Sequence, residues 1–360
     1  MAKILLISAY DAASHRYWRE SLCAQFSHHQ WQQAYLPPRF FSWRQAGNVL
    51  SLQQSYTQEL QQQYDLIIAT SMTNMALLKG LYPHLSAVPS CLYFHENQFA
   101  YPHNDDKNRN LQLIQLNSIY SALSAHQLLF NSHYNQQTWL QGVDALMHKM
   151  PDFKPNDLSK SFAEKSTVLP VPIPVDCVSK PDRRSKPLTL VWNHRWEYDK
   201  GIQQLLWFLR MLKQQQIAFK IHIIGQVFRQ QPEVFDEIHS EFEPHIGHWG
   251  FVPERQDYVR ILQQSDVVIS TALHEFQGLA VMEAVACGCL PLVPDRLAYQ
   301  EYYPADYRYT SILDDPQAEA QAMCSQLKLM LDNPPESIMA QDLSWHRLKP
   351  QYTKVIEQWL

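Results

Sequence analysis

Residues 266–288 read DVVISTALHEFQGLAVMEAVACG and decide the fold class of the chain. Val267–Ser270 is a short β-branched run, which predicts a buried parallel strand. After a polar turn, the pattern predicts a helix over Gly278–Cys287, with Gly288 in the position that ends it. A buried strand that leads through a turn into a helix is the unit from which doubly wound α/β sheets are built.

Two carboxylates belong to this strand–turn–helix unit. Glu275 stands at the carboxyl end of the strand beside unpaired backbone N–H groups, and Glu283 follows eight residues later, so both can face one crevice. A helix N-terminus favours a phosphate or a sugar hydroxyl, and carboxylates bind hydroxyl groups through charge-assisted hydrogen bonds. The plainer interpretation is a helix with two solvated glutamates, and the pattern alone favours neither.

The stretch from Glu275 to Gly288 resembles the E-x7-E signature of the family-four retaining glycosyltransferases. In that family the first glutamate lies beside the donor sugar and the second holds the ribose of the sugar nucleotide. The resemblance implies the GT-B architecture, in which two Rossmann-like, doubly wound parallel-sheet domains face each other across a cleft. It also implies that the turn between the two glutamates binds the donor through Phe276, Gln277, Gly278 and Leu279.

Length and charge limit the remaining possibilities. A chain of 360 residues with 46% hydrophobic content suits two domains better than one core. The net charge of −5 argues against a global field that attracts nucleic acid. Residues 1–172 are nearly neutral, with 12 Lys and Arg against 11 Asp and Glu, whereas the second half carries the acidic excess. A local basic surface is therefore possible in the first half.

The six cysteines show no paired metal-ligand spacing. Together with the missing signal-peptide pattern, this predicts a reducing, cytoplasmic environment. No apolar run reaches the ~18 residues that a membrane span needs, so we expect no membrane association.

Apolar runs alternate with helical patterns along the chain, which predicts α/β domains with parallel sheets. In the first half we expect strands at Ile4–Ile7, Leu66–Ala69, Cys91–Phe94 and Leu128–Phe130, and helices at His15–Phe26, Met72–Leu81, Asn110–Ala125 and Tyr134–Gln141. In the second half we expect strands at Leu188–Trp192, Phe219–Ile224, His248–Val252, Val267–Ser270 and Leu290–Val293, and helices at Gly201–Gln214, Glu233–Phe242, Glu254–Gln264, Gly278–Cys287 and Pro316–Leu331.

The domain boundary is predicted at Val168–Asp176, where prolines at 170, 172 and 174 favour an extended crossing. We expect an acceptor-side domain over residues 1–172, a linker over 173–187 and a nucleotide-sugar-binding domain over 188–345. By analogy with the GT-B architecture, residues 346–360 form a last helix that crosses back to the first domain.

Two loops of the first half follow predicted strands, where ligands of such sheets bind. His95 is either a histidine whose hydrogen bonds are satisfied within its loop or a contact in the active site. On the acceptor side, we expect the two loops to contribute Asp11, Ser14, His15, Glu96, Asn97 and Tyr101. The segment Leu146–Ser166 has no apolar period and carries lysines at 149, 154, 160 and 165, which predicts a solvated loop or a contact with a phosphate backbone.

Arg195 and Lys200 lie five residues apart between a predicted strand and a predicted helix. They are either a diphosphate clamp or a surface pair balanced by neighbouring acids. The stretch resembles the Arg/Lys clamp of the same glycosyltransferase family, which implies that both stabilise the leaving diphosphate. Further donor contacts are implied at Asn193, Gly225, Phe251 and Val252. Gly225 could instead be a plain turn glycine and Phe251 a core residue, and we expect Trp249 to belong to the core.

A closer resemblance runs through both halves, from about Leu5 to Pro304. The stretches YFHENQ at 93–98, WNHRWE at 192–197 and TALHE at 271–275 resemble the tRNA-queuosine α-mannosyltransferase family. This implies transfer of mannose from GDP-mannose to the cyclopentene-diol of queuosine at the tRNA wobble position. One departure is that Ala12 and Ala13 stand where that family tends to carry two glycines, so the role of the first loop stays open.

The implied mechanism retains the configuration of the sugar and uses no metal, because no Asp-x-Asp element follows a strand. Arg195, Lys200 and the helix N-terminus at Gly278 would neutralise the leaving diphosphate, and Glu275 would orient the sugar or stabilise its positive charge. His95 would contact the donor sugar or the acceptor. The alternatives are a hexosyltransferase of the same fold with another nucleotide sugar or with a small-molecule or glycan acceptor, and a non-catalytic adaptor that binds a nucleotide sugar or RNA.

Overall fold

The structure is a computed structural model that describes residues 1–100, 111–174, 187–228, 231–333 and 343–360. The chain forms two compact units. The first unit contains Met1–Pro172 and Trp345–Leu360, and the second contains Ile173–Ser344. Most of the expected linker, residues 175–186, lies outside the described residues, and so does Tyr101.

The described residues of the first unit build a parallel sheet of six strands in the order β2-β1-β3-β4-β5-β6. The strands are β1 Lys3–Ser8, β2 Gln30–Tyr35, β3 Leu66–Thr70, β4 Ser90–Phe94, β5 Gln127–Phe130 and β6 Ser166–Val168. The helices are α1 Ala13–Gln25, α2 Phe41–Ser55, α3 Thr57–Leu60, α4 Met75–Leu81, α5 Leu111–Ser124, α6 His133–Lys149, α7 Leu158–Glu164 and α14 Trp345–Glu357.

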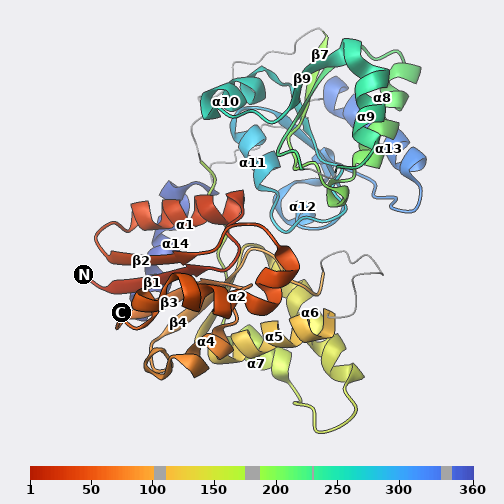
Figure 1. Ribbon diagram of the computed structural model, residues 1–360. Coiled ribbons are helices and arrows are strands. Elements are labelled where there is room, and N and C mark those ends of the chain that lie inside the picture. The colour runs from red at the N-terminus through yellow and green to blue at the C-terminus, as the bar shows by residue number, and fades with distance from the viewer. Residues whose placement is uncertain (101–110, 175–186, 229–230, 334–342) are drawn as a thin grey trace. The chain divides into compact units, whose positions relative to one another are not determined.

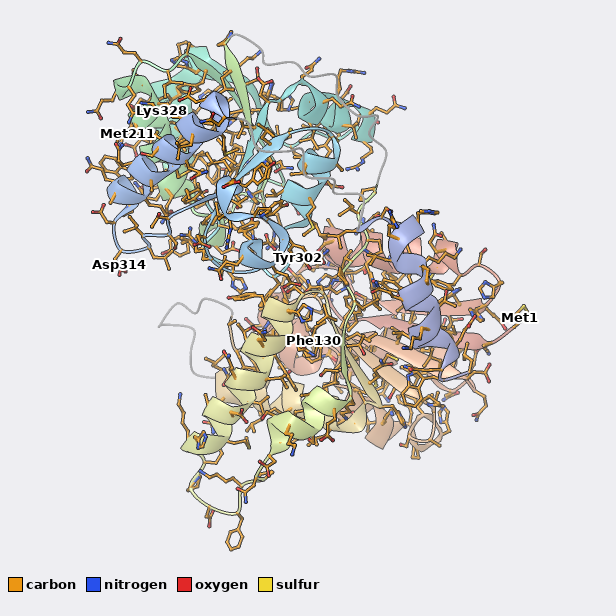
Figure 2. The ribbon with its side chains drawn as sticks, turned by 180° about the vertical axis from the view of Figure 1, so that it is seen from behind. Met1, Phe130, Met211, Tyr302, Asp314 and Lys328 are labelled. Atoms are coloured by element: carbon orange, nitrogen blue, oxygen red, sulfur yellow. The ribbon has the colours of Figure 1, made fainter. Side chains whose placement is uncertain are left out.

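The apolar runs of β1, β3, β4 and β5 are buried because helices cover both faces of this sheet (Figure 1). Phe130, labelled in Figure 2, is fully buried and stacks on Phe94 at 4.4 Å between ring centroids. Helix α14 packs beside α1, where Trp18 Nε1 donates a hydrogen bond to Tyr352 Oη at 3.0 Å. The C-terminal segment is thereby part of the first unit.

The described residues of the second unit form another parallel sheet of six strands, in the order β12-β11-β10-β7-β8-β9. The strands are β7 Leu188–Trp192, β8 Phe219–Ile224, β9 Ile246–Gly250, β10 Val267–Ile269, β11 Leu290–Pro294 and β12 Arg308–Tyr309. The helices are α8 Ile202–Gln214, α9 Val234–Phe242, α10 Arg255–Gln264, α11 Leu279–Ala286, α12 Tyr299–Tyr302 and α13 Pro316–Asp332.

Helices cover both faces of the second sheet. Helices α8, α9 and α13 gather on one side and α10 and α11 on the other (Figure 1). Met211 on α8 and Lys328 on α13 mark two neighbouring helices in Figure 2. The two parallel, helix-covered sheets confirm the α/β fold class that the alternating pattern predicts.

The segment Leu146–Ser166 corrects the prediction of a solvated loop. Helix α6 continues to Lys149, helix α7 covers Leu158–Glu164, and Ser166 begins β6. Local apolar spacing explains the error, because Leu158 and Phe162 lie four residues apart and pack against the core of the first unit. Strand β2 was also missed, since QWQQAY lacks the apolar alternation that predicts a strand.

Strand β9 begins two residues before the predicted strand and ends at Gly250, whose φ of +98° breaks the extended backbone. None of the described helices combines the length and the apolar character that a membrane span requires.

Candidate functional site

The site of the second unit begins where β10 ends. Strand β10 is buried between β7 and β11, and the chain turns through residues 270–278 before α11 begins at Leu279. Gly278 precedes the helix with φ at +83°, and a Cβ there would lie 2.9 Å from the ring of Tyr299. Glycine therefore permits both the left-handed backbone and the close approach of the turn to α12.

Lys200 is the buried cation of this site. It ends a short 3₁₀-helix over Tyr198–Lys200 that follows β7. Its Nζ lies 2.9 Å from the carbonyl oxygen of His274, 3.0 Å from Asp199 Oδ2 and 3.3 Å from Glu275 Oε2. Burial alone would lower the pKa of Lys200, but Glu275 and Asp199 more than offset it, so the pKa lies above 10.5 and the side chain is charged.

Glu275 faces Lys200 from the turn before α11. Burial would raise the pKa of its carboxyl group, but the charge and hydrogen bond of Lys200, together with His194 and His274, outweigh it and hold the pKa at about 2. The backbone N–H of Phe276 donates to Glu275 Oε1 at 3.1 Å, which fixes the carboxylate in the turn. We call Lys200, Asp199 and Glu275 the charge cluster.

Backbone contacts connect the loop after β7 with the turn after β10, the two segments that carry the charge cluster. The N–H groups of Leu273 and His274 donate to the carbonyl oxygen of Asp199 at 2.9 and 3.2 Å. A Cβ on Gly201, whose φ is +67°, would lie 1.9 Å from the carbonyl oxygen of Thr271. If Arg195 and Lys200 were a surface pair balanced by neighbouring acids, Asp199 would be exposed, but the structure buries it beside Lys200. The spacing of residues in the sequence does not predict this burial.

Arg195 lies at the surface of the same region, and its side chain is 42% exposed. Its Nη1 pairs with Glu197 Oε2 at 3.0 Å, and an exposed pair of this kind contributes little to stability. The neighbouring Trp196 is buried and stacks on Phe235 at 4.1 Å, which anchors the backbone beside Arg195. Arg195 can thus exchange its partner for a phosphate at small cost to stability.

Two buried histidines that the sequence analysis passed over flank the charge cluster. Burial, reinforced by the charge of Lys200, lowers the pKa values of His194 and His274 to about 4. Both imidazoles are therefore neutral near pH 7. Gly225 packs on the same loop, because a Cβ there would lie 1.8 Å from the carbonyl oxygen of His194. This loop packing requires the glycine whether or not a ligand also approaches it.

Glu283 lies on α11 and is held from two sides. Arg255 Nη1 and Tyr258 Oη each lie 3.0 Å from one of its carboxylate oxygens. Asn193 Nδ2 donates to Tyr258 Oη at 3.0 Å and to the carbonyl oxygen of Ala280 at 2.7 Å. Asn193 therefore ties the end of β7 to α10 and α11, and a role for it in donor binding stays a prediction.

The remaining predicted donor residues lie after β9 and in the turn that leads into α11. Phe251 is 62% exposed just past β9, whereas Val252 packs against the core of the second unit. Trp249 also packs on that core and meets Trp196 edge to face at 4.7 Å, as its assignment to the core requires. Phe276, Gln277 and Leu279 lie in the turn and first position of α11.

Three of the five predicted acceptor residues that the structure describes are buried within the first unit, namely Asp11, His15 and Asn97. Both carboxylate oxygens of Asp11 accept hydrogen bonds from Arg19, at 3.1 and 2.9 Å. The Asn97 side chain donates to Asn135 and Thr138 and accepts from the backbone N–H groups of Phe99 and Ala100. Asp11 and Asn97 thus shape their loops rather than offer free hydrogen-bonding groups.

The two predicted histidines of the first unit form one stack. His15 and His95 lie parallel at 4.1 Å between ring centroids, and Trp18 meets His95 edge to face at 5.0 Å. Burial, with a contribution from His15, lowers the pKa of His95 well below its usual value of 6.5. His95 is therefore a neutral, buried histidine, while Ser14 beside the stack is exposed.

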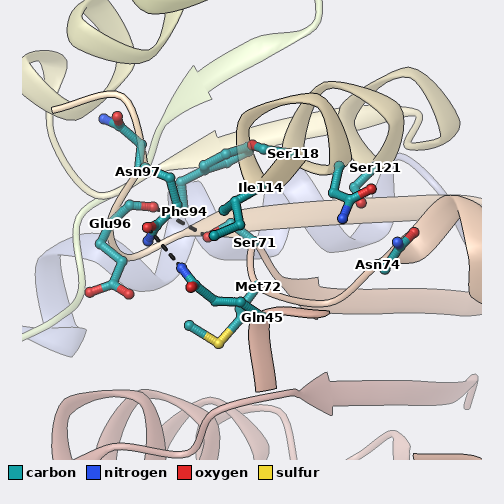
Figure 3. Close-up of a pocket in the computed structure, with 12 residues that line it drawn as sticks. Gln45, Ser71, Met72, Asn74, Phe94, Glu96, Asn97, Ile114, Ser118 and Ser121 are labelled. Carbon is teal, nitrogen blue, oxygen red and sulfur yellow. Dashed lines mark hydrogen bonds between the residues drawn. The ribbon is translucent and has the colours of Figure 1, made fainter. Parts of the chain in front are cut away.

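Glu96 lines a pocket between α5 and the loops that follow β3 and β4 (Figure 3). Ser71 Oγ donates to the carbonyl oxygen of Glu96 at 3.3 Å, and Gln45 Nε2 donates to Gln98 Oε1 at 2.8 Å (Figure 3). The second bond connects α2 with the loop that follows β4. The lining is rich in amides and hydroxyl groups, including Asn74, Asn117, Ser118 and Ser121.

Of the four lysines predicted to contact a phosphate backbone, Lys165 is held within the first unit. Lys165 Nζ points inward and donates to the carbonyl oxygens of Ala122 and Ala125 at 2.8 and 2.6 Å. Asp152 and Asp157 also stand among the other three lysines in the sequence. The segment is therefore a weaker candidate for RNA contacts than its lysine count suggests.

Two family models match the chain. Residues 3–173 match the tRNA-queuosine alpha-mannosyltransferase N-terminal family, and residues 178–344 match glycosyl transferases group 1. A tRNA-queuosine alpha-mannosyltransferase from Drosophila melanogaster is 34% identical over 318 residues, which span 86% of this chain and 83% of the relative.

Solved structures share the fold at low sequence identity. HepE from Anabaena, solved in complex with UDP, is 15% identical with a TM-score of 0.67, and the match covers 99% of this chain and 100% of that one. Sucrose-phosphate synthase from Thermosynechococcus elongatus is 12% identical with a TM-score of 0.72, and 99% of each chain is covered. These likenesses confirm the Rossmann-like domains of the GT-B fold. The family matches and the 34% identical relative show that the chain is a glycosyltransferase and belongs to the tRNA-queuosine α-mannosyltransferase family.

Proposed function

We propose that this chain transfers mannose from GDP-mannose to the cyclopentene-diol of queuosine in tRNA, with retention of configuration at the sugar. The observation that carries the proposal is the charge cluster beside the N-terminus of α11, on a chain whose relative is a tRNA-queuosine alpha-mannosyltransferase. A buried lysine and a helix N-terminus both favour a diphosphate, and the carboxylate of Glu275 favours sugar hydroxyl groups.

In the proposed reaction, the bond between C1 of mannose and the β-phosphate oxygen breaks while a diol oxygen of the acceptor bonds to C1 on the same face. The acceptor proton passes to a phosphate oxygen, and GDP leaves. Arg195 can release Glu197 and bind the phosphate whose negative charge grows. Lys200 supplies a fixed positive charge and reaches a phosphate oxygen directly when it exchanges its most distant partner, Glu275.

Glu275 is ionised at neutral pH because its pKa is about 2, so it acts as a hydrogen-bond acceptor and a source of negative charge. We propose that it orients the mannose hydroxyl groups and stabilises positive charge at C1 without bonding to it. Glu283 would accept hydrogen bonds from the ribose when Arg255 moves aside, which its position at the surface permits. No metal is needed in this scheme, because the two cations and the helix N-terminus neutralise the diphosphate.

The test is incubation of the protein with queuosine-containing tRNA and isotope-labelled GDP-mannose, followed by nuclease digestion and mass spectrometry of the nucleosides. We expect a labelled hexose on queuosine, and no transfer to tRNA that carries guanosine in its place. Parallel reactions with UDP-glucose and UDP-galactose test the donor, and free queuosine nucleoside tests whether the whole tRNA is required. A hexose from a UDP-sugar, or a hexose on another acceptor, would replace the proposal with the corresponding alternative.

A further inference from the structure

The segment between β2 and α2 carries exposed aromatic and cationic side chains that have no role in the reaction described above. It reads PPRFFSW over residues 37–43. Phe40 is 70% exposed and Trp43 is 49% exposed. Arg39 is exposed beside them, with its guanidinium carbon 5.7 Å from the centre of the Phe40 ring. We call Arg39, Phe40 and Trp43 the aromatic platform.

Trp43 is held in place although half of it is open to solvent. Its indole lies across Gly47, where an added Cβ would be 2.5 Å from Trp43 Cη2. Its Nε1 donates to Ser51 Oγ at 3.2 Å. The ring is therefore covered from within α2 and fixed in orientation, so that little side-chain entropy remains to be lost when a flat ligand stacks on it.

Phe40 is exposed in a backbone conformation that a residue with a Cβ rarely adopts. Its φ of 58° and ψ of 54° are left-handed, and it occupies the N-cap of α2 without a side-chain cap hydrogen bond. Left-handed backbone costs about 1–2 kcal/mol for such a residue, and Phe40 recovers little of this by burial. Strain that packing does not explain is a feature of ligand-binding segments.

Charge and position favour a polyanion near the acceptor loops. The sequence contains no Asp or Glu between Glu20 and Glu59, so no carboxylate of this stretch opposes Arg39. The platform follows β2 at the carboxyl edge of the first sheet. Phe41 meets Tyr10 of the loop after β1 edge to face at 5.4 Å, which places the platform next to the loop that leads into α1 and Ser14.

We propose that the aromatic platform stacks unpaired nucleotides next to the modified nucleotide of the RNA acceptor, with Arg39 against a phosphate. Single-stranded nucleic acid is bound by exposed aromatic faces combined with arginine, and every base offers a face for stacking. The inference rests on the proposed function, because it takes the acceptor to be RNA. It assigns RNA contacts to residues 39–43 rather than to the lysines of α6 and α7.

The experiment compares Phe40→Ala and Trp43→Ala with Leu50→Ala, a matched control that removes an exposed apolar side chain of α2 outside the platform. Binding is measured by fluorescence anisotropy with an unmodified tRNA transcript, so that the readout does not depend on turnover. Steady-state transfer to queuosine-containing tRNA is measured in parallel. Circular dichroism checks that each variant is folded.

Each aromatic variant is expected to weaken RNA binding and raise the KM for tRNA by roughly 10-fold, since base stacking has about that worth. The KM for GDP-mannose and the kcat at saturating tRNA should stay near those of Leu50→Ala. Trp43→Phe retains a ring and should restore most of the affinity. Arg39→Ala should lower the slope of log affinity against log salt by about one.

Folded Phe40→Ala and Trp43→Ala proteins with the RNA affinity of Leu50→Ala would overturn the platform, and the exposed rings would then serve a partner other than RNA. This outcome is distinct from failure of the proposed function. If the proposed function fails, the wild-type protein transfers no mannose to queuosine-containing tRNA, while the binding assay still tests whether the platform binds RNA.

Discussion

The loops at the carboxyl ends of the two sheets use charge in different ways. In the second unit, Lys200 and Asp199 are buried, Glu275 is partly buried against Lys200, and Arg195 lies at the surface beside them. In the first unit, Asp11 is buried and both of its carboxylate oxygens accept hydrogen bonds from buried Arg19. The second unit thus concentrates charge where a diphosphate is expected, whereas the first uses charge to shape a loop. A polar residue in a loop at the carboxyl ends of the strands can therefore bind a ligand only if its side chain is not already held by hydrogen bonds within its own unit.

The largest effect is expected from Lys200→Ala. Loss of the buried cation should reduce turnover by about 100-fold to 1000-fold, as removal of one electrostatic stabiliser does elsewhere. It should also lower the free energy of unfolding by about 3–5 kcal/mol, because buried Asp199 and partly buried Glu275 lose their shared cation. Turnover and urea unfolding measure the two effects. Lys200→Arg, which keeps the charge, should recover more stability than turnover.

Asp11→Ala tests the other side of the comparison. Arg19 would stay buried with only the exposed Glu20 as its carboxylate partner, so we expect a loss of about 3 kcal/mol in the free energy of unfolding. The kcat of the folded protein should change less than about threefold, which is under 1 kcal/mol. Unchanged stability together with a large fall in kcat would make Asp11 a substrate contact, as the sequence analysis expected.

Acidification should destabilise the second unit in two stages. The pKa of His194 is about 4 in the folded protein and about 6.5 in the unfolded chain. Between these pH values the unfolded chain binds a proton at His194 and the folded protein does not, so the free energy of unfolding falls by up to about 3 kcal/mol as the pH falls. Below about 4.5, Glu275 adds a second loss, because its folded pKa is about 2 and the unfolded chain binds the proton first. Urea unfolding at several pH values measures both stages.

His194→Gln supplies the control for this profile. The variant should show a shallower fall between pH 6.5 and 4 than the wild type, since one of the buried imidazoles is gone. Identical pH profiles for the two proteins would mean that His194 titrates normally in the folded state.

Arg195→Ala is expected to have the smallest effect on stability and a moderate one on catalysis. Turnover should fall by at least about 10-fold, given the energies of charge-assisted hydrogen bonds. The free energy of unfolding should change by less than about 0.5 kcal/mol, because the pair with Glu197 is exposed. Arg210→Ala, which removes a surface ion pair of α8 with Glu237 and Glu241, is the matched control. Wild-type turnover in Arg195→Ala would remove Arg195 from the proposed clamp.

Local sequence predicted the second unit well, because its signals are short in range. The apolar run at Val267 to Ile269 and the glycine at 278 locate β10, the turn and α11. The five-residue spacing of Arg195 and Lys200 brackets the loop after β7. What spacing could not show is that Asp199 and His194 are buried beside Lys200, since burial depends on contacts between β7 and β10.

The first unit was harder to predict for two physical reasons. Strand β2 contains three glutamines and carries no apolar alternation, so its pairing with β1 is decided by tertiary contacts. The acceptor residues were predicted from the chemistry of their side chains alone. In the structure, Asp11 and Asn97 form hydrogen bonds within the first unit and His95 is buried. The sequence did not predict that the ring of Phe40 is exposed, because an aromatic residue is normally assigned to a core.

The most direct test of the central claim is a crystal structure with GDP-mannose bound. We expect the diphosphate within hydrogen-bonding distance of Arg195 and the first backbone N–H groups of α11, with Lys200 close enough to contact it. The ribose should lie against Glu283 and the mannose against Glu275. A nucleotide sugar bound elsewhere, with the ion pair of Lys200 and Glu275 untouched, would contradict the account.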